Sequence, residues 1–206
     1  MQASREGNGM TTTVLFIEHL ISGIQAGIWL ILFMLSILGL KFLESLRWNG
    51  YESLLLIILL SLLYPLGVFV DELADALFSR ANRRIRTKIM KAEGLENTSF
   101  SIMNLLRSEN DEYLANYLGY IRTRIRISRS AVVNFVLITI SVVVFTVTRL
   151  QQVTVLPTSL LLLIEIAAGG FMIGLAWWAW NHITHTFARR IAQIYKLKNP
   201  DTFSME

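Results

Sequence analysis

The sequence predicts an all-α integral membrane protein with four transmembrane helices and a cytoplasmic helical hairpin or stalk between spans two and three. Three observations indicate this class. Of the 206 residues, 53% are hydrophobic and only 17% are charged, whereas soluble domains carry about 25% charged residues. The mean hydropathy is +0.50, and the apolar residues gather in four long runs. A soluble enzyme, a nucleic-acid-binding domain and a disordered chain are therefore excluded as descriptions of the whole chain.

Each apolar run has the length of a membrane span, which takes roughly 20 residues. Leu20–Leu40, Ser53–Val70 and Ser130–Thr148 contain no charged residue, and the stretch from Leu150 to Asn181 contains only Glu165. The predicted organisation is a cytoplasmic tail over residues 1–13, spans one and two with a short outer turn over 14–70, a cytoplasmic helical region over 71–130, spans three and four with a short outer turn over 131–181, and a cytoplasmic C-terminal helix and tail over 182–206.

The distribution of the basic residues predicts the orientation. Eleven of the 19 Lys and Arg residues lie between Asp71 and Arg129. With both termini inside, 16 basic residues face the cytoplasm and 3 face outward. Because loops rich in Lys and Arg stay in the cytoplasm, we expect a multi-pass protein of the plasma membrane, the inner membrane of a bacterium, with cytoplasmic N- and C-termini. Tryptophans 177, 178 and 180 then lie at the inner interface, where such residues act as anchors.

The cytoplasmic region between spans two and three is predicted to be helical. Leu73, Leu77, Ile85 and Ile89 recur at helical spacing, which continues span two as far as Ala92. Gly94 is the clearest break, because glycine commonly ends helices. A short helix over Phe100–Leu106 and a long helix capped by Asp111 are expected to follow, the second running into span three.

The residues needed for several kinds of chemistry are missing. The chain has no cysteine, so it can form no disulfide, thiolate metal site or cysteine nucleophile. It contains no phosphate-binding loop, no Ser–His–Asp order and no His-Glu-x-x-His motif. About sixty residues of amphipathic helix are also too few to form a catalytic domain. We therefore expect no enzymatic activity and no cofactor.

Glu165 is the membrane-embedded residue that bears most on function. It lies nine positions beyond Leu156, which at about 1.5 Å per residue places it roughly 14 Å deep, near the bilayer midplane. Ser61 and Thr139 lie at similar depth, and Gln25 lies nearer the inner face. An ionisable residue at this depth marks an ion path, a proton site or a paired interior contact. Two interpretations stay open: a protonated carboxyl within the helix packing, and a carboxyl that lines a pore or exchanges protons.

Two glycine pairs predict close helix contacts. Gly23 and Gly27 are four residues apart on span one, and Gly170 and Gly174 have the same spacing on span four. This spacing removes side chains from one face, so that backbones can approach. The two pairs predict either a contact between spans one and four within one chain or an interface between subunits.

A metal site is not predicted, although weak candidate ligands exist. His182 and His185 are three apart on one helix face, and Glu18 lies at the same predicted interface. No known metal-binding spacing covers the three residues together.

Two groups of arginines flank the cytoplasmic region. Arg80, Arg83 and Arg84 follow span two, and Arg122, Arg126 and Arg129 share one helix face before span three. We expect these residues to bind anionic lipid headgroups, at about 1 kcal/mol each, or to form a docking surface for an acidic cytosolic protein partner, a nucleotide or nucleic acid. Pairing of the second group with Asp71, Glu72 and Asp75 is a further alternative. No sequence-specific binding of nucleic acid is expected.

Two functions from different classes fit these features. One is a non-enzymatic, homo-oligomeric inner-membrane subunit that senses the membrane state or anchors a cytosolic partner, as in membrane subunits of bacterial antiviral defence or stress systems. The alternative is an oligomeric ion channel or depolarising pore with Glu165 in or near its path. The layout is similar to that of connexin- and innexin-type channels, whose outer-loop cysteines are absent here. Spans two and three are almost wholly apolar, which favours a sealed bundle and hence the first function.

Overall fold

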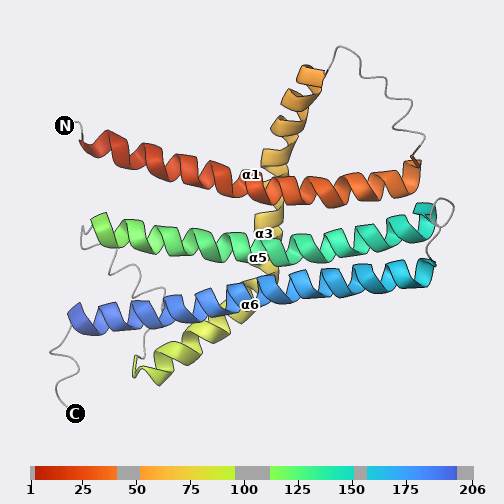
Figure 1. Ribbon diagram of the computed structural model, residues 1–206. Helices are drawn as coiled ribbons and strands as arrows, with labels where there is room; N and C mark the ends of the chain where they lie inside the picture. The colour runs from red at the N-terminus through yellow and green to blue at the C-terminus, as the bar shows by residue number, and fades with distance from the viewer. Residues whose placement is uncertain (1–2, 41–51, 96–111, 151–156, 199–206) are drawn as a thin grey trace.

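The computed structural model describes residues 3–40, 52–95, 112–150 and 157–198, which form four long helices (Figure 1). The helices are α1 (Ala3–Leu38), α3 (Glu52–Ala92), α5 (Glu112–Arg149) and α6 (Thr158–Lys198). Each contains a stretch that is long and apolar enough to cross a membrane. The prediction of an all-helical chain with four such helices is confirmed. Because α1 already begins at Ala3, most of the tail predicted over residues 1–13 belongs to the first helix.

Three of the helices lie side by side, and the fourth crosses them. α5 lies between α1 and α6 and packs against both, while α3 crosses this three-helix layer steeply (Figure 1). Beyond the crossing, α3 continues along α6, where Phe78 contacts Trp180 with ring centroids 4.7 Å apart. Further along, Lys196 Nζ pairs with Glu93 Oε2 at 2.9 Å. The second half of α3 is therefore attached to the C-terminal half of α6.

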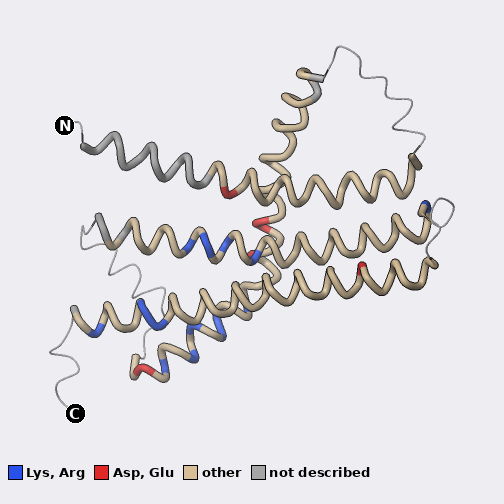
Figure 2. Tube along the Cα trace, in the orientation of Figure 1, with Lys and Arg blue, Asp and Glu red and all other residues tan. Residues whose placement is uncertain are grey.

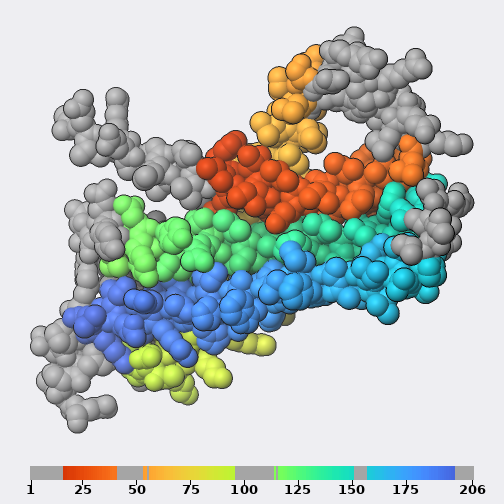
Figure 3. All heavy atoms as spheres, in the orientation of Figure 1, coloured from red at the N-terminus to blue at the C-terminus, as the bar shows by residue number. Residues whose placement is uncertain are grey.

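The first half of α3 projects away from the three-helix layer, as the space-filling view shows in orange (Figure 3). We refer to residues 54–62 as the α3 arm. The large apolar side chains given for this arm are between 47 and 65% exposed; they are Leu54, Leu56, Ile57, Ile58, Leu59, Leu60 and Leu62. A helix that is apolar on every side is stable only inside lipid or against another chain. The arm therefore requires one of these two surroundings.

The charges gather at one end of the bundle, which we call the charged end. Lys and Arg cluster on the first part of α5 and on the last parts of α3 and α6 (Figure 2). Arg149 is the last residue of α5, at the other end of that helix. The largest fully buried side chains also lie toward the charged end, among them Trp180, Phe187 and Met90. Trp180 is 1% exposed and packs inside the bundle, whereas Trp177 and Trp178, expected with it at the inner interface, are 49 and 64% exposed.

Glycines in the left-handed region follow the ends of two helices. Gly94 has φ of +74° just beyond α3, as expected from the sequence, and Gly39 has φ of +83° just beyond α1. A left-handed residue allows the last carbonyls of a helix to find donors. Arg149 serves the end of α1, donating to the carbonyl oxygens of Ser36 at 3.0 Å and Ile37 at 2.7 Å. The short helix predicted over residues 100–106 and the cap at position 111 lie outside the described residues.

Candidate functional site

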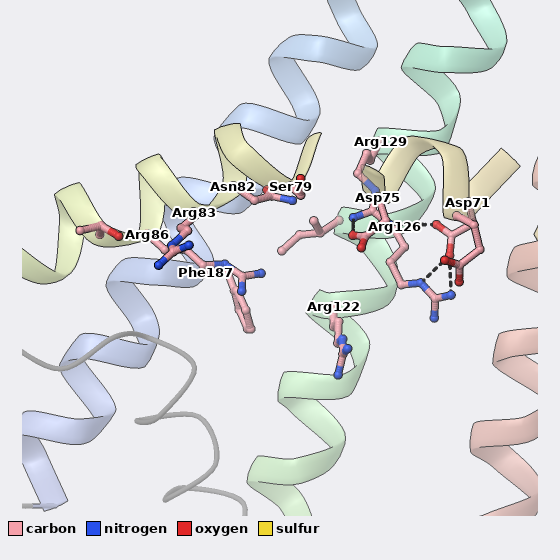
Figure 4. A pocket seen from close by; sticks show the side chains of 13 residues that line it. Asp71, Asp75, Ser79, Asn82, Arg83, Arg86, Arg122, Arg126, Arg129 and Phe187 are labelled. Atoms are coloured by element: carbon pink, nitrogen blue, oxygen red, sulfur yellow. Dashed lines mark hydrogen bonds and ion pairs between the residues drawn. The ribbon is translucent and has the colours of Figure 1, made fainter. Parts of the chain in front are cut away.

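Charged side chains, three of them buried, are concentrated where α1, α3 and α5 meet, and we call these five residues the ion-paired junction. They are Glu18 from α1, Asp71 and Asp75 from α3, and Arg126 and Arg129 from α5. Arg126 Nε donates to Asp71 Oδ2 at 3.0 Å, and Arg129 Nη2 donates to Asp71 Oδ1 at 3.1 Å (Figure 4). Arg126 Nε also lies 3.2 Å from Glu18 Oε1, and Arg129 Nη1 contacts Asp75 Oδ1. One carboxylate, Asp71, thus bonds two guanidinium groups.

Residue spacing explains why these charges meet. The two aspartates are four residues apart on α3, and the two arginines are three apart on α5, so each pair occupies one face of its helix. Asp71 and Arg129 are 4 and 5% exposed, which removes both from most of the solvent. Ser130 Oγ adds a third donor to Asp71, at 3.2 Å from Oδ1. Of the alternatives left open by the sequence, the one with Arg126 and Arg129 paired to carboxylates is the arrangement observed.

The junction is strongly paired but incompletely hydrogen-bonded. Arg129 Nε has no acceptor within the described part of the chain, although it is buried. Removing one partner of a buried ion pair typically costs about 3–5 kcal/mol, because it leaves the other charge uncompensated. Buried charges are best attested where they fix the register of helices or take part in a switch. The junction contains buried charges from three helices, as expected of a site that fixes helix register or acts as a switch.

A polar cluster continues from the junction into the apolar part of the bundle. Asn134 on α5 is completely buried. Its amide nitrogen donates to the carbonyl oxygen of Ser22 at 3.1 Å and to Gln25 Oε1 at 3.2 Å, and its Oδ1 accepts from Trp29 Nε1 at 3.2 Å. Asn134 was not among the residues predicted from the sequence. The available signal was the four-residue spacing of Arg122, Arg126, Ser130 and Asn134, which forms a polar stripe along one face of α5.

The first glycine pair lies where α1 crosses α3. A Cβ atom at Gly23 would overlap the carbonyl oxygen of Leu63, and one at Gly67 would overlap the carbonyl oxygen of His19. A Cβ at Gly27 would lie 2.8 Å from Leu63 Cδ2. The contact of span one is therefore made with α3 and not with α6. Asp71 follows Gly67 by one helical turn, so the closest backbone approach lies directly beside the junction.

The second glycine pair faces open space. Nothing lies within 4 Å of a Cβ atom built at Gly170 or Gly174. Close packing of α6 occurs instead at Gly169, where a Cβ would overlap the side chain of Thr139 on α5. The expected contact between the two glycine pairs within one chain is thus not made.

The four polar residues expected within the apolar spans have separate partners. Glu165 Oε1 accepts a hydrogen bond from Thr146 Oγ1 at 2.5 Å, and Oε2 has no partner within the described residues. Thr139 and Ser61 donate to carbonyl oxygens of their own helices, and Ser61 is exposed. Gln25 belongs to the Asn134 cluster.

The weak metal candidates are not brought together. His182 is exposed and stacks on Trp178 with centroids 5.5 Å apart, while Glu18 belongs to the junction. In the described ranges no group of three or more His, Cys, Asp or Glu residues could hold a metal ion.

The arginines predicted to bind a partner divide into two sets. Arg80, Arg83, Arg84 and Arg122 are exposed. Arg126 and Arg129 are turned into the junction, so that, of the face predicted as a three-arginine docking surface, only Arg122 has no ion-pair partner among the described residues. Both arginines pair with carboxylates of α3, and hydrogen bonds between a guanidinium and a carboxylate are stronger than those between neutral groups.

A cavity of about 610 Å³ opens beside the junction, between α3, α5 and α6 (Figure 4). Its lining includes five arginines, namely the two of the junction together with Arg83, Arg86 and Arg122. It includes three carboxylates, namely the two aspartates of the junction and Glu72. The lining therefore carries a formal excess of two positive charges. Arg86 belongs to the same basic stretch after span two, but its place between the helices depends on how α3 crosses the bundle, which the spacing along one helix does not predict.

The chain matches no protein-family model, no curated protein and no solved structure at a significant level. Its function must therefore be inferred from the junction, the cavity and the apolar surfaces.

Proposed function

We propose that the protein is a non-enzymatic, homo-oligomeric subunit of the bacterial inner membrane, with both termini in the cytoplasm, that senses the state of the membrane and anchors a cytosolic partner at its charged end. The observation that carries this proposal is the ion-paired junction. It connects α3, the helix that crosses the others, to α1 and α5 at a single level.

The sensing mechanism follows from the position of α3. Its apolar arm lies in the bilayer, and its charged half lies in the cytoplasm. A change in bilayer thickness alters the preferred tilt of a membrane helix. Because α3 contacts α1 backbone to backbone at Gly23 and Gly67, this crossing acts as a pivot. The junction is one turn beyond the pivot. A change in the tilt of α3 therefore strains the ion pairs of the junction before it displaces Arg80 and Arg84.

Two apolar or bare surfaces support self-association. The large apolar side chains described on the α3 arm are all exposed, and no described residue of another helix lies within 4 Å of a Cβ atom built at Gly170 or Gly174 on α6. Small residues at four-residue spacing allow a helix of another copy to approach closely. A symmetric homo-oligomer in nanodiscs is expected, and a clean monomer at micromolar concentration in nanodiscs would contradict this part of the proposal.

The cytosolic partner is assigned to the exposed basic residues of α3. Changing Arg80 and Arg84 to Glu removes two outward cations without touching the junction or the cavity lining. The expected result is loss of a co-purifying cytosolic protein with unchanged oligomer size. Co-purification that survives this double change would remove the α3 surface from the proposal.

The orientation can be tested separately because the chain has no cysteine. Single cysteines at Asn49 and Thr98 should label oppositely in intact cells. An impermeant thiol reagent should modify Asn49→Cys and not Thr98→Cys, and labelling at position 98 from outside would reverse the topology.

The sensing itself is tested by distances in bilayers of different thickness. Spin labels at Ile37 on α1 and Leu54 on α3, both exposed, report the tilt of the arm. Their distance distribution should shift between thin and thick bilayers, and the shift should be altered by Asp71→Asn but not by Glu72→Gln. A control pair at Thr148 and Leu160 on α5 and α6 should not shift. A distance between positions 37 and 54 that is independent of thickness would contradict the proposal.

The alternative function, an oligomeric channel, has one observation in its favour. Glu165 Oε2 is buried and accepts no hydrogen bond from a described residue, as expected of a carboxylate that receives its partner from a neighbouring copy, a proton or an ion. A steady current in planar bilayers that is abolished by Glu165→Gln would favour the channel.

A further inference from the structure

Three arginines of the cavity beside the junction have no carboxylate partner. Arg83 and Arg86 on α3 and Arg122 on α5 line the cavity, and none forms an ion pair with a residue in the described ranges. The other two lining arginines are already bonded to Asp71 and Asp75. Guanidinium groups from two helices therefore line one hollow in which positive charge exceeds negative charge (Figure 4).

The crowding of like charge is greatest at Arg86. The charges of Arg122 and Arg129 repel it, and Asp75 provides the opposing attraction. Its Nε is buried and has no hydrogen-bond acceptor among the described residues. A buried donor without an acceptor and a cation among cations both cost free energy. An anion placed between these side chains would remove both costs at once.

The lining also indicates the kind of anion. Arginine presents paired N–H groups that bind phosphate oxygens in a bidentate manner, more specifically than the ammonium of lysine. The volume, about 610 Å³, falls within the range of roughly 300–1,000 Å³ that is typical of sites for small organic ligands and not single ions. Phe187 and Ile125 add an apolar wall. Asn82 is 8% exposed, lines the cavity and has an Oδ1 without a donor, which suits a hydroxyl or amino group of a ligand.

We propose that this cavity binds an organic phosphate, its phosphate oxygens held by Arg83, Arg86 and Arg122 and its uncharged part placed against Phe187 and Asn82. Two sources supply this chemistry: the headgroup of an anionic phospholipid and a soluble phosphate ester. Four residues of the ion-paired junction line the cavity, so a bound phosphate would also act on the junction. This regulatory role rests on the proposed function, whereas binding of the phosphate does not.

The test uses the full-length protein in nanodiscs of zwitterionic lipid, with inorganic pyrophosphate as the soluble probe and phosphatidylglycerol as the lipid probe. Pyrophosphate affinity is measured by titration calorimetry, and retained phosphatidylglycerol by native mass spectrometry. Binding of either probe is expected to weaken at least tenfold in the double variant Arg86→Gln, Arg122→Gln. The matched control, Arg84→Gln, removes an exposed arginine outside the cavity lining and should change the affinity less than twofold.

The outcomes distinguish the two sources and the two proposals. Pyrophosphate binding identifies a soluble phosphate ester, and phosphatidylglycerol retention without pyrophosphate binding identifies a lipid headgroup. Failure to bind either probe, or an equal loss of affinity in the Arg84→Gln control, would overturn the assignment.

A second measurement uses the protein without any probe. The melting temperature of the Arg86→Gln variant should be no lower than that of the wild type, because the substitution relieves repulsion; a lower melting temperature would also count against the site. If a probe binds but the spin-label distance between α1 and α3 does not change with bilayer thickness, the phosphate site is supported and the proposed sensor is rejected.

Discussion

The ion-paired junction and the Glu165 site are both polar regions among helices of a membrane-spanning type, but they are built differently. At the junction, two guanidinium groups and three carboxylates connect α1, α3 and α5. At Glu165, one hydrogen bond from Thr146 connects α5 and α6. The first holds together helices that cross steeply, whereas the second joins helices that already lie side by side (Figure 1).

This difference shows that depth alone does not rank polar residues by importance. Glu165 is the more conspicuous residue in the sequence, because it is the single charge in a long apolar run. Yet the bundle places most of its buried charge at the end of the spans, where α3 needs a specific partner to hold its crossing. We therefore expect the junction, and not the midplane, to dominate both stability and coupling.

The largest effect is expected from Asp71→Asn. The amide keeps the shape of the side chain but leaves Arg126 and Arg129 without their shared carboxylate, which should lower the free energy of unfolding by about 3–5 kcal/mol. Unfolding in mixed micelles under increasing denaturing detergent measures the change. Glu72→Gln, at the neighbouring exposed position, is the control and should stay within about 0.5 kcal/mol. An equal decrease in the free energy of unfolding in both variants would show that the junction contributes no more to stability than an exposed carboxylate does.

An intermediate effect is expected where α1 crosses α3. Gly67→Ala places a methyl group against the backbone of His19, and overpacking of this kind costs about 1–3 kcal/mol. In the same assay, Gly174→Ala should be neutral or slightly stabilising, since its Cβ meets nothing within 4 Å and alanine is the better helix former. A tolerated alanine at position 67 would mean that the backbones do not touch there.

The smallest effect is expected from Glu165→Gln. Glutamine retains an oxygen that can accept from Thr146, and hydrogen bonds between membrane helices contribute about 0.6 kcal/mol on average. Assembly should persist, and planar-bilayer recordings should show no wild-type current for the substitution to abolish. If the variant loses more than Asp71→Asn does, the ranking of the two regions is reversed.

The four helices could be read from the sequence because apolar runs of span length have few alternatives. The break at Gly94 was likewise predictable, since its left-handed conformation suits glycine. The steep course of α3 was not predictable, because the spacing of Gly23 and Gly27 predicts a close contact but does not identify Gly67 on α3 as the partner.

The candidate site was predictable only in its parts. Arg126 and Arg129 were recognised, and Asp71 and Asp75 were named as alternative partners, but spacing along one helix cannot decide between a solvent-facing and a paired arginine. Asn134 was overlooked because a single amide in an apolar span gives no sequence signal of its own. Its role follows from its hydrogen-bond partners on α1, which only the fold shows.

A pair of double-mutant cycles measures most directly whether the junction, and not the midplane, couples the helices. The first cycle combines Asp71→Asn with Arg129→Gln, and the second combines Glu165→Leu with Thr146→Val, with unfolding free energies measured in the same micelles. We predict a coupling energy above about 1.5 kcal/mol for the first cycle and about 0.6 kcal/mol for the second. Additivity of Asp71→Asn and Arg129→Gln within about 0.5 kcal/mol, or equal coupling in the two cycles, would contradict the central place given to the junction.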